Sequence, residues 1–247
     1  MKIECVEGII IQDTNYSESS KILNILTKEF GLIGVLSRGC RNLKSKFRAS
    51  SRKLVYGKFH IYYKGNALST LIAIDVISTY SNILSDLNRI TYASYILELT
   101  SQVLRENKKE QIFLLLKDAL DKISIGLDPL VITNIIEVKY LNFLGVGLIM
   151  DRCSVCGSTK NIITLDSASG GLVCRDCYNE GLIVGEKTIK LIRMFYYVDL
   201  GKIDKIDLNS ATIQEVNRFI EEYYERYTGL YLKSKRLIDQ VIRLTTV

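Results

Sequence analysis

Four cysteines in the second half of the chain form two Cys-x-x-Cys pairs. Cys153 and Cys156 make the first pair, Cys174 and Cys177 make the second, and residues 157–173 separate the two. Two residues between cysteines let one tight turn direct both thiolates at a single ion, and two such turns complete a tetrahedral shell of four sulfurs. The spacing therefore predicts one structural Zn²⁺. Four protein ligands leave no open coordination position for activating water.

Other uses of these cysteines fit the sequence less well. Disulfides are typical of secreted chains, but this chain opens Met-Lys-Ile-Glu-Cys-Val-Glu, with acids where a secretory signal has basic and then apolar residues. A thioredoxin-like redox motif needs only one Cys-x-x-Cys pair and leaves the second unexplained. Cys5 and Cys40 lie far from the two pairs, and we interpret them as small half-buried residues.

The composition is that of a soluble cytoplasmic protein. A length of 247 residues predicts one core with one or two small modules, and the apolar share of 47% is ample for that core. No apolar run approaches the eighteen or so residues of a membrane span. The net charge of +6 permits an anionic partner but does not identify one.

Positive charge is concentrated in one short segment. Residues 38–53 carry seven basic side chains and no acidic one, whereas residues 1–37 carry three basic and five acidic ones. A solvated surface normally mixes signs, because unpaired like charges repel. The segment therefore favours a polyanion site, with nucleic acid as the leading candidate. The seven residues are Arg38, Arg41, Lys44, Lys46, Arg48, Arg52 and Lys53.

The first eighty residues predict a small barrel. Strands are expected at 8–12, 21–29, 32–37, 54–64 and 68–77, with turns at 15–17, Gly31 and Gly65-Asn66. Five short strands without an intervening helix indicate an OB-fold, the five-stranded barrel that binds single strands. The basic segment then lies between the third and fourth strands.

One face of the fourth predicted strand could contact a nucleic acid. Tyr56, Lys58, His60 and Tyr62 share this face, because side chains alternate along a strand. Aromatic and cationic side chains together can stack bases and hold phosphates, although both are also ordinary on exposed strands. We therefore predict contacts from Tyr56, Lys58 and Tyr62. His60 is the only histidine, and no nucleophile–base set can be read around it.

From residue 87 the apolar period is helical. Two helices follow, and Asp128 as N-cap with Pro129 begins a third that ends before Gly145. A helix over 186–198, a capping box of Thr212 with Glu215, and a final helix over 232–244 complete the pattern. The predicted class is α+β: an OB-fold over 1–80, a helical domain over 81–150 and 183–247, and a zinc module inserted at 151–182.

Short strings along the whole chain resemble the RecO family of bacterial recombination mediators. Near the N-terminus they are Gly8-Ile9-Ile10, Tyr16-Ser17-Glu18-Ser19, Leu26-Thr27, Gly31-Leu32, Arg38-Gly39 and Lys44-Ser45. Later come Phe143-Leu144-Gly145, the two cysteine pairs with Ser169-Gly170-Gly171-Leu172-Val173 before Cys174, and Leu232-Lys233-Ser234. The cysteine framework makes the set specific.

The resemblance implies a nucleoid-associated DNA repair protein that is not an enzyme. Members bind single- and double-stranded DNA, anneal complementary strands and, with RecR, help load RecA onto strands coated by single-strand-binding protein. The basic segment corresponds to the family's DNA-binding loop, with Arg38, Arg41, Lys44, Lys46 and Arg48 as the main candidates. The family often has a proline near 53–55, which this chain lacks. Some members lack the cysteines, which makes zinc a scaffold.

A second basic group lies near the C-terminus and has three interpretations. It could extend the DNA path, receive the acidic C-terminal tail of single-strand-binding protein, or form a solvated helix face. Its members are Lys233, Lys235, Arg236 and Arg243, opposed only by Asp239.

Two other functions also remain open. One is an RNA-binding transcription or translation factor with an OB-fold and a zinc ribbon. The other is a zinc-stabilised enzyme acting on nucleic acid, although the chain has no Gly-x-x-x-x-Gly-Lys loop and no compact carboxylate cluster.

Overall fold

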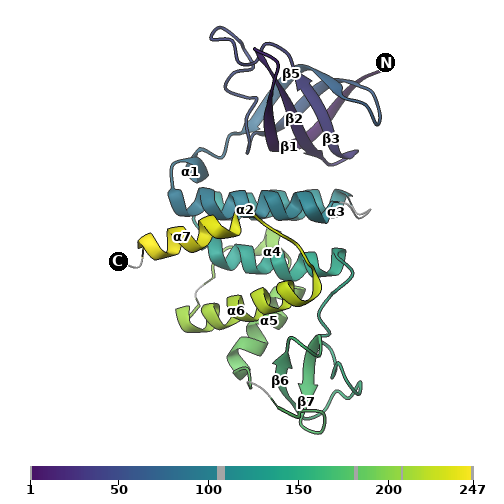
Figure 1. Ribbon diagram of the computed structural model, residues 1–247, viewed down its shortest axis with the longest axis vertical. Helices are drawn as coiled ribbons and strands as arrows, with labels where there is room; N and C mark the ends of the chain where they lie inside the picture. Colours follow the sequence, from purple (N-terminus) through teal and green to yellow (C-terminus); the bar gives the residue numbers. More distant parts are fainter. Residues whose placement is uncertain (1, 105–108, 181–182, 207, 246–247) are drawn as a thin grey trace. The chain divides into compact units, whose positions relative to one another are not determined.

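The computed structural model describes residues 2–104, 109–180, 183–206 and 208–245 (Figure 1). The chain divides into two compact units, one of Met1–Gly126 with Ser234–Val247 and one of Leu127–Lys233. The domain limits expected from the sequence stay a prediction: they place a division where the barrel ends, at residue 80, whereas the compact units divide after Gly126. Among the described helices, none is both long and apolar enough to cross a bilayer.

The N-terminal part of the first unit is the predicted five-stranded barrel of the OB class. Its strands pair in the order β1-β2-β3-β5-β4 and close on themselves through β1 and β4. All pairings are antiparallel except a short parallel one between β3 and β5. The strands are β1 (Lys2–Tyr16), β2 (Ser20–Thr27), β3 (Gly31–Ser37), β4 (Tyr56–Tyr63) and β5 (Ser69–Ser78).

Strand β1 is fifteen residues long, much longer than the expected 8–12. Its first half pairs with β4 and its second half with β2, so polar residues at both ends take part in ladders that periodicity does not reveal. A bulge between Ile10 and Gln12 separates the two halves, and Ile9, Ile10 and Ile11 are all buried there. The continuous apolar run therefore marks the bend of the strand and not its ends.

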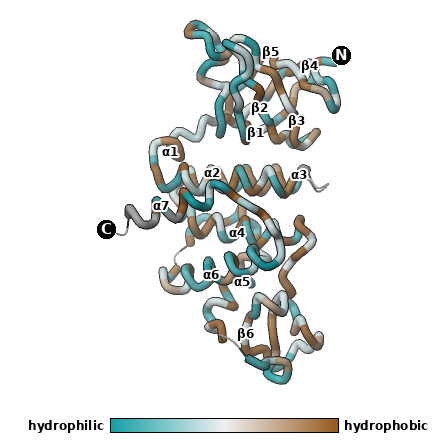
Figure 2. The backbone as a smooth tube through the Cα atoms, in the orientation of Figure 1, coloured by the Kyte–Doolittle hydropathy of each residue, from teal (hydrophilic) through white to brown (hydrophobic). Residues whose placement is uncertain are grey.

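The interior of the barrel is filled by aliphatic side chains and one phenylalanine from all five strands. Figure 2 shows both hydrophobic and hydrophilic stretches on the barrel strands, and burial alternates along β3 and most of β4, as expected when one face of a strand meets a core. The core residues are Val6, Ile10, Leu23, Ile25, Ile33, Val35, Val55, Phe59, Ile61 and Leu71. The basic segment leaves this core between β3 and β4, and we call residues 38–55 the basic loop.

Helices α1 (Ser81–Leu84), α2 (Leu87–Val103), α3 (Lys109–Ser124) and α7 (Lys235–Thr245) complete the first unit. Helix α2 contacts β1, α3 and α7, and α3 contacts β2 and β3. Tyr80 donates to the Asp121 carboxylate at 2.8 Å, and Lys117 donates to the other oxygen of the same group at 2.8 Å. The first bond joins the chain after the barrel to α3, and the second lies within α3.

The second unit holds the cysteine pairs between helices. It comprises α4 (Pro129–Phe143), the hairpin β6 (Ile162–Asp166) and β7 (Gly171–Cys174), α5 (Glu186–Tyr197), the 3₁₀ turn η1 (Leu200–Lys202) and α6 (Ser210–Tyr227). Asp128 caps α4 as predicted, accepting from the N–H groups of Leu130 and Val131.

The predicted capping box of Thr212 with Glu215 is wrong. Asn209 caps α6, and its side chain accepts from the N–H of Ala211. Glu215 instead reaches α5, where it accepts from the Gly185 N–H and from the Thr188 hydroxyl. A carboxylate at the start of α5 suits the positive end of that helix, so the same residue type caps a helix distant in sequence.

Candidate metal centre and nucleic-acid interface

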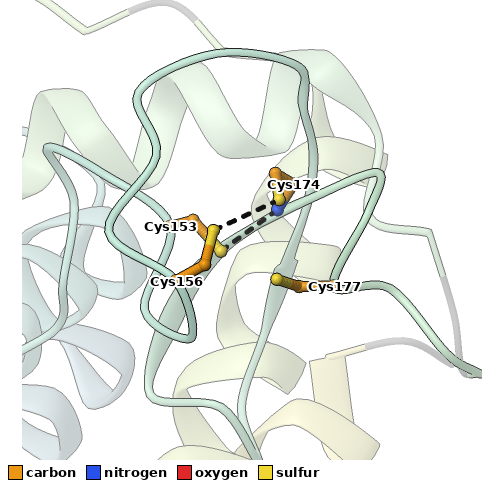
Figure 3. A group of neighbouring side chains, drawn as sticks. All are labelled: Cys153, Cys156, Cys174 and Cys177. Carbon is orange, nitrogen blue, oxygen red and sulfur yellow. Dashed lines mark hydrogen bonds between the residues drawn. The ribbon is translucent and has the colours of Figure 1, made fainter.

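The structure brings the four paired cysteines together. Figure 3 shows their sulfur atoms facing one another, and all four lie within 4.8 Å of each other. The Sγ atoms of Cys156 and Cys174 are 3.7 Å apart. A tetrahedral ion with Zn–S bonds of about 2.3 Å needs sulfurs about 3.8 Å apart, so the arrangement fits a four-thiolate site and is too open for a disulfide.

Two equivalent turns position these sulfurs. The Gly157 N–H donates to the carbonyl of Cys153 at 2.9 Å, and the Tyr178 N–H donates to that of Cys174 at 3.1 Å. In each pair the donor lies four residues after the first cysteine. Gly157 has a φ of +75°, a conformation that favours glycine. The first cysteine pair lies in the loop before β6, and the second begins at the end of β7.

Backbone groups also favour ionised sulfur at Cys153. Burial opposes ionisation of this thiol, but donors from Cys156, Cys174 and Val155 together lower its pKa to about 6. The Cys174 N–H lies 3.4 Å from the Cys153 sulfur. N–H groups directed at a thiolate are typical of a metal–sulfur site, because only the ionised sulfur is a strong ligand. The four cysteines can therefore hold a metal ion.

All seven side chains of the basic run are exposed on the basic loop. Within the described part of the chain, none of them forms an ion pair with an acidic side chain. The Arg41 guanidinium donates to the Ser17 carbonyl at 3.2 Å, and the Lys46 ammonium lies 5.0 Å from the Phe47 ring centroid. The positive charge is thus presented to solvent without acidic neighbours.

The loop that carries this charge is anchored to the barrel at several points. Ser37 and Ser51 are buried, and their hydroxyl oxygens are 2.9 Å apart across its base. Cys40 and Leu54 bury their side chains with 2% and 1% exposure. Cys40 is therefore more deeply buried than we expected, and Cys5 is exposed. Fixed anchors reduce the entropy lost when the loop binds a partner.

Asp13 supports the end of the basic loop, a role that sequence reasoning missed. It pairs with Lys21 at 2.6 Å, and its other oxygen accepts from the Lys53 N–H at 3.2 Å. Lys21 in turn donates to the Ser51 carbonyl at 3.2 Å. Residues far apart in sequence make this network, so no local pattern marks it. The Asp13 carboxylate is thereby paired with Lys21 and does not neutralise the basic run.

The same contacts explain why no proline stands at 53 or 54. Lys53 donates its N–H to Asp13, and proline has no N–H to donate. Leu54 has a φ of +67°, whereas the proline ring fixes φ near −65°. Leu54 is held there by its buried side chain and by its N–H bond to the Ile10 carbonyl at 3.0 Å. The end of the loop follows a path that excludes proline.

The predicted aromatic face of β4 is only partly available. Lys58 is exposed and the Tyr62 side chain is 40% exposed, but Tyr56 is only 7% exposed. The Tyr56 hydroxyl donates to Glu7, and the Lys117 ammonium lies 5.7 Å from its ring centroid. Its ring therefore has little surface on which a base could stack. Periodicity identified the more exposed face of β4 but not Lys117, which α3 brings to the Tyr56 ring.

His60 lies on the same face, paired with Asp75 at 2.7 Å. The exposed Cys5 is its cross-strand partner in the β1–β4 ladder. A cysteine nucleophile would need a hydrogen bond to this imidazole. No such bond joins Cys5 and His60, both of which belong to the described part of the chain. The three residues are neighbours on the sheet without forming a catalytic set.

The second basic group lies on elements other than the basic loop. Lys233 and Arg236 are exposed and Lys235 is half-buried at the start of α7. All three have further interactions, so they are not free cations. The side chains of Asp239 and Arg243 lie outside the described residues.

Family models account for most of the chain. Residues 1–80 match the model described as "Recombination protein O N terminal", and residues 84–236 match "Recombination protein O C terminal". The chain belongs to the RecO family. The first match covers the barrel with its basic loop, and the second covers the cysteine module and most of the helices.

Similar proteins agree with this assignment. A protein named DNA repair protein RecO from Listeria monocytogenes is 35% identical, over 97% of this chain and 95% of its own. Proteins of the same name from Bacillus velezensis and Bacillus cytotoxicus are 35% and 34% identical, covering 95% and 96% of this chain and 93% and 96% of their own. RecO membership confirms the family inferred from short strings and places the chain in DNA repair and recombination.

Proposed function

We propose that this protein binds single- and double-stranded DNA through the basic loop and anneals complementary strands. One observation carries the proposal: seven exposed cations lie on one anchored loop without an acidic partner among the described residues. DNA phosphates would supply the missing negative charge, and an OB-fold commonly binds single strands. Family membership in DNA repair supports DNA as the polyanion in preference to RNA.

The proposed mechanism is electrostatic. Two DNA strands repel each other, so their pairing is slow until cations reduce the repulsion. A loop that places cations against both strands lowers this barrier, and phosphate contacts leave the base edges free to pair. No covalent bond changes in this mechanism, so the protein would act without being an enzyme. The protein's residues then hold and align strands by charge.

We propose zinc as the metal of the cysteine centre and a structural role for it. Four cysteine sulfurs spaced for a tetrahedral ion match the ligand preference of Zn²⁺. The hairpin that they close has only two short strands, so an ion held by all four cysteines would add stability to the module. A closed shell gives the ion no position for a substrate.

The proposed partners follow from the family. RecR and RecA would take part in loading recombinase onto strands coated by single-strand-binding protein, near the nucleoid. The basic residues Lys233, Lys235 and Arg236 suit the acidic C-terminal tail of that coating protein, because an acidic segment needs cations. They could instead prolong the DNA path.

The decisive experiment is annealing of complementary strands precoated with the cognate single-strand-binding protein. We expect acceleration with the intact coating protein and a smaller effect when its acidic tail is removed. An RNA-binding factor would instead bind RNA more tightly than DNA of the same sequence and leave coated strands apart. Cleavage of the strands in magnesium or manganese would contradict the proposed absence of enzymatic activity.

A further inference from the structure

Leu43 is the most exposed large hydrophobic side chain among the described residues, at 83%. It lies in the basic loop between the exposed Arg41 and Lys44. Single exposed leucines are common on protein surfaces. This one, however, is not needed to anchor the loop, because Cys40 and Leu54 are buried and another apolar loop residue, Phe47, packs against the barrel core. Leu43 is available to a partner.

Tyr16 is a second exposed hydrophobic residue next to the loop, with 50% exposure. It ends β1 at the tip of the β1–β2 hairpin. Within the described part of the chain its hydroxyl makes no hydrogen bond. About half of its surface is open to a partner, and among the described residues its ring makes no aromatic or cation–π contact.

Hydrogen bonds join the hairpin tip to the start of the basic loop. The Arg41 N–H donates to the Ser19 carbonyl at 2.8 Å, and its guanidinium donates to the Ser17 carbonyl at 3.2 Å. The Gly39 N–H donates to the Ser20 hydroxyl at 3.3 Å. Tyr16 is therefore adjacent in the chain to a residue bonded to Arg41, and Leu43 lies two residues after Arg41. Both exposed hydrophobic residues therefore lie within two residues of a group in the Arg41–Ser17 hydrogen bond.

The chemistry of this cluster matches a single DNA strand. Cations can hold the phosphates, while an exposed ring and an aliphatic side chain can contact the faces of unstacked bases. Duplex DNA offers phosphates too, but its base faces are covered by stacking. Contacts to base faces therefore distinguish a single strand from a duplex without reading sequence.

We propose that Tyr16 and Leu43 contact unstacked bases of a single DNA strand whose phosphates are held by the basic loop. These contacts would make the interface bind single strands more tightly than duplex. The inference rests on the proposed function, namely that the basic loop binds DNA. Because only two side chains are involved, most bases of the bound strand stay free to pair.

The test compares three fluorescein-labelled probes of equal length: oligodeoxythymidylate, an abasic strand with the same phosphates, and a duplex. Tyr16→Ala with Leu43→Ala should weaken binding to thymidylate about tenfold or more. Binding to the abasic strand and to the duplex should change by less than about twofold, and the salt slope should stay the same, because no phosphate contact is lost. Leu43→Ala alone should show a smaller loss of the same selectivity, and Tyr16→Phe should bind like the unaltered protein.

A matched control is Tyr197→Ala with Leu87→Ala, which removes a tyrosine and a leucine exposed by 58% and 64% on α5 and α2. It should bind all three probes like the unaltered protein. Equal losses on thymidylate and abasic DNA, or no loss on either, would overturn the proposal. The proposed function fails in a different way: the unaltered protein would then bind none of the probes, or would bind them with a salt slope near zero.

Discussion

The basic loop and the cysteine module are both built from tight turns, but they use their reactive groups in opposite ways. In the module, backbone turns direct four sulfurs at one another, so the site is complete within the chain. On the loop, seven cations are exposed, and no acid among the described residues pairs with them. A closed ligand set suits stability, whereas an unpaired charge set suits a partner from outside.

The largest effect is expected from removing one of the four cysteine ligands. Cys174→Ser removes a buried ligand, so we expect loss of the bound metal and a fall in the free energy of unfolding of about 4 kcal/mol or more. Metal analysis and chemical denaturation measure the two effects. Cys5→Ser is the control, since Cys5 is exposed and does not belong to the group of four clustered cysteines. A folded, metal-free protein of unchanged stability would contradict a structural role.

Removing cations from the basic loop should change the affinity for DNA and not the stability of the protein. If about five phosphates are neutralised, a plot of log affinity for single strands against log salt concentration should have a slope of roughly −3.5. The triple variant Arg41→Ala, Lys44→Ala and Lys46→Ala should have a shallower slope of roughly −1.4, because about three phosphate contacts are lost. The loss should be the same for all sequences. Fluorescence anisotropy over a series of salt concentrations measures the slope.

A matched control for this triple variant removes the same charge elsewhere. Lys187, Lys190 and Arg193 are exposed on α5. Replacing these three by alanine should leave the slope near its original value. If both triple variants lowered the slope equally, net charge and not the loop would account for binding.

Local chemistry made parts of both regions predictable. The Cys-x-x-Cys spacing identified the four sulfurs, because each pair is closed by a turn within five residues. The seven cations were equally visible as a run. Alternation gave the strands and the buried face of β4, and Asp128 with Pro129 gave the start of α4.

Features that depend on contacts between distant residues were missed or misread. The full length of β1 depends on pairing with β4 and β2. Glu215 fits a local capping box in the sequence, yet its carboxylate caps α5. Tyr56 shares a strand face with exposed residues, but its hydroxyl bonds to Glu7 and α3 brings Lys117 to its ring. Single-sequence periodicity contains no information on such neighbours.

Weakening the support of the loop should have an intermediate effect. Asp13→Ala removes the acceptor for Lys21 and for the Lys53 N–H, and we expect a loss of about 1–3 kcal/mol in the free energy of unfolding. Affinity for DNA should fall only modestly, because all seven cations remain. Asp75→Ala is a control on the barrel exterior, where the His60 pair is exposed and should contribute little. Denaturant melts and anisotropy on the same samples separate the two effects.

The smallest effect is expected from Tyr56→Phe, which tests whether this buried tyrosine belongs to the fold or to the DNA interface. The variant loses the hydroxyl bond to Glu7, so a loss of about 1 kcal/mol in stability is expected at neutral pH, with DNA affinity unchanged.

Burial, and then the hydrogen bond to Glu7, raise the pKa of Tyr56 above its ordinary value near 10. As the pH rises above about 10, the unfolded chain loses this phenolic proton before the folded chain does, so the stability of the unaltered protein should fall. Tyr56→Phe should lack that contribution, and the stability difference between the two proteins should narrow in alkaline denaturant melts. A Tyr56→Phe protein that kept its stability but lost affinity for single strands would instead assign Tyr56 to the interface.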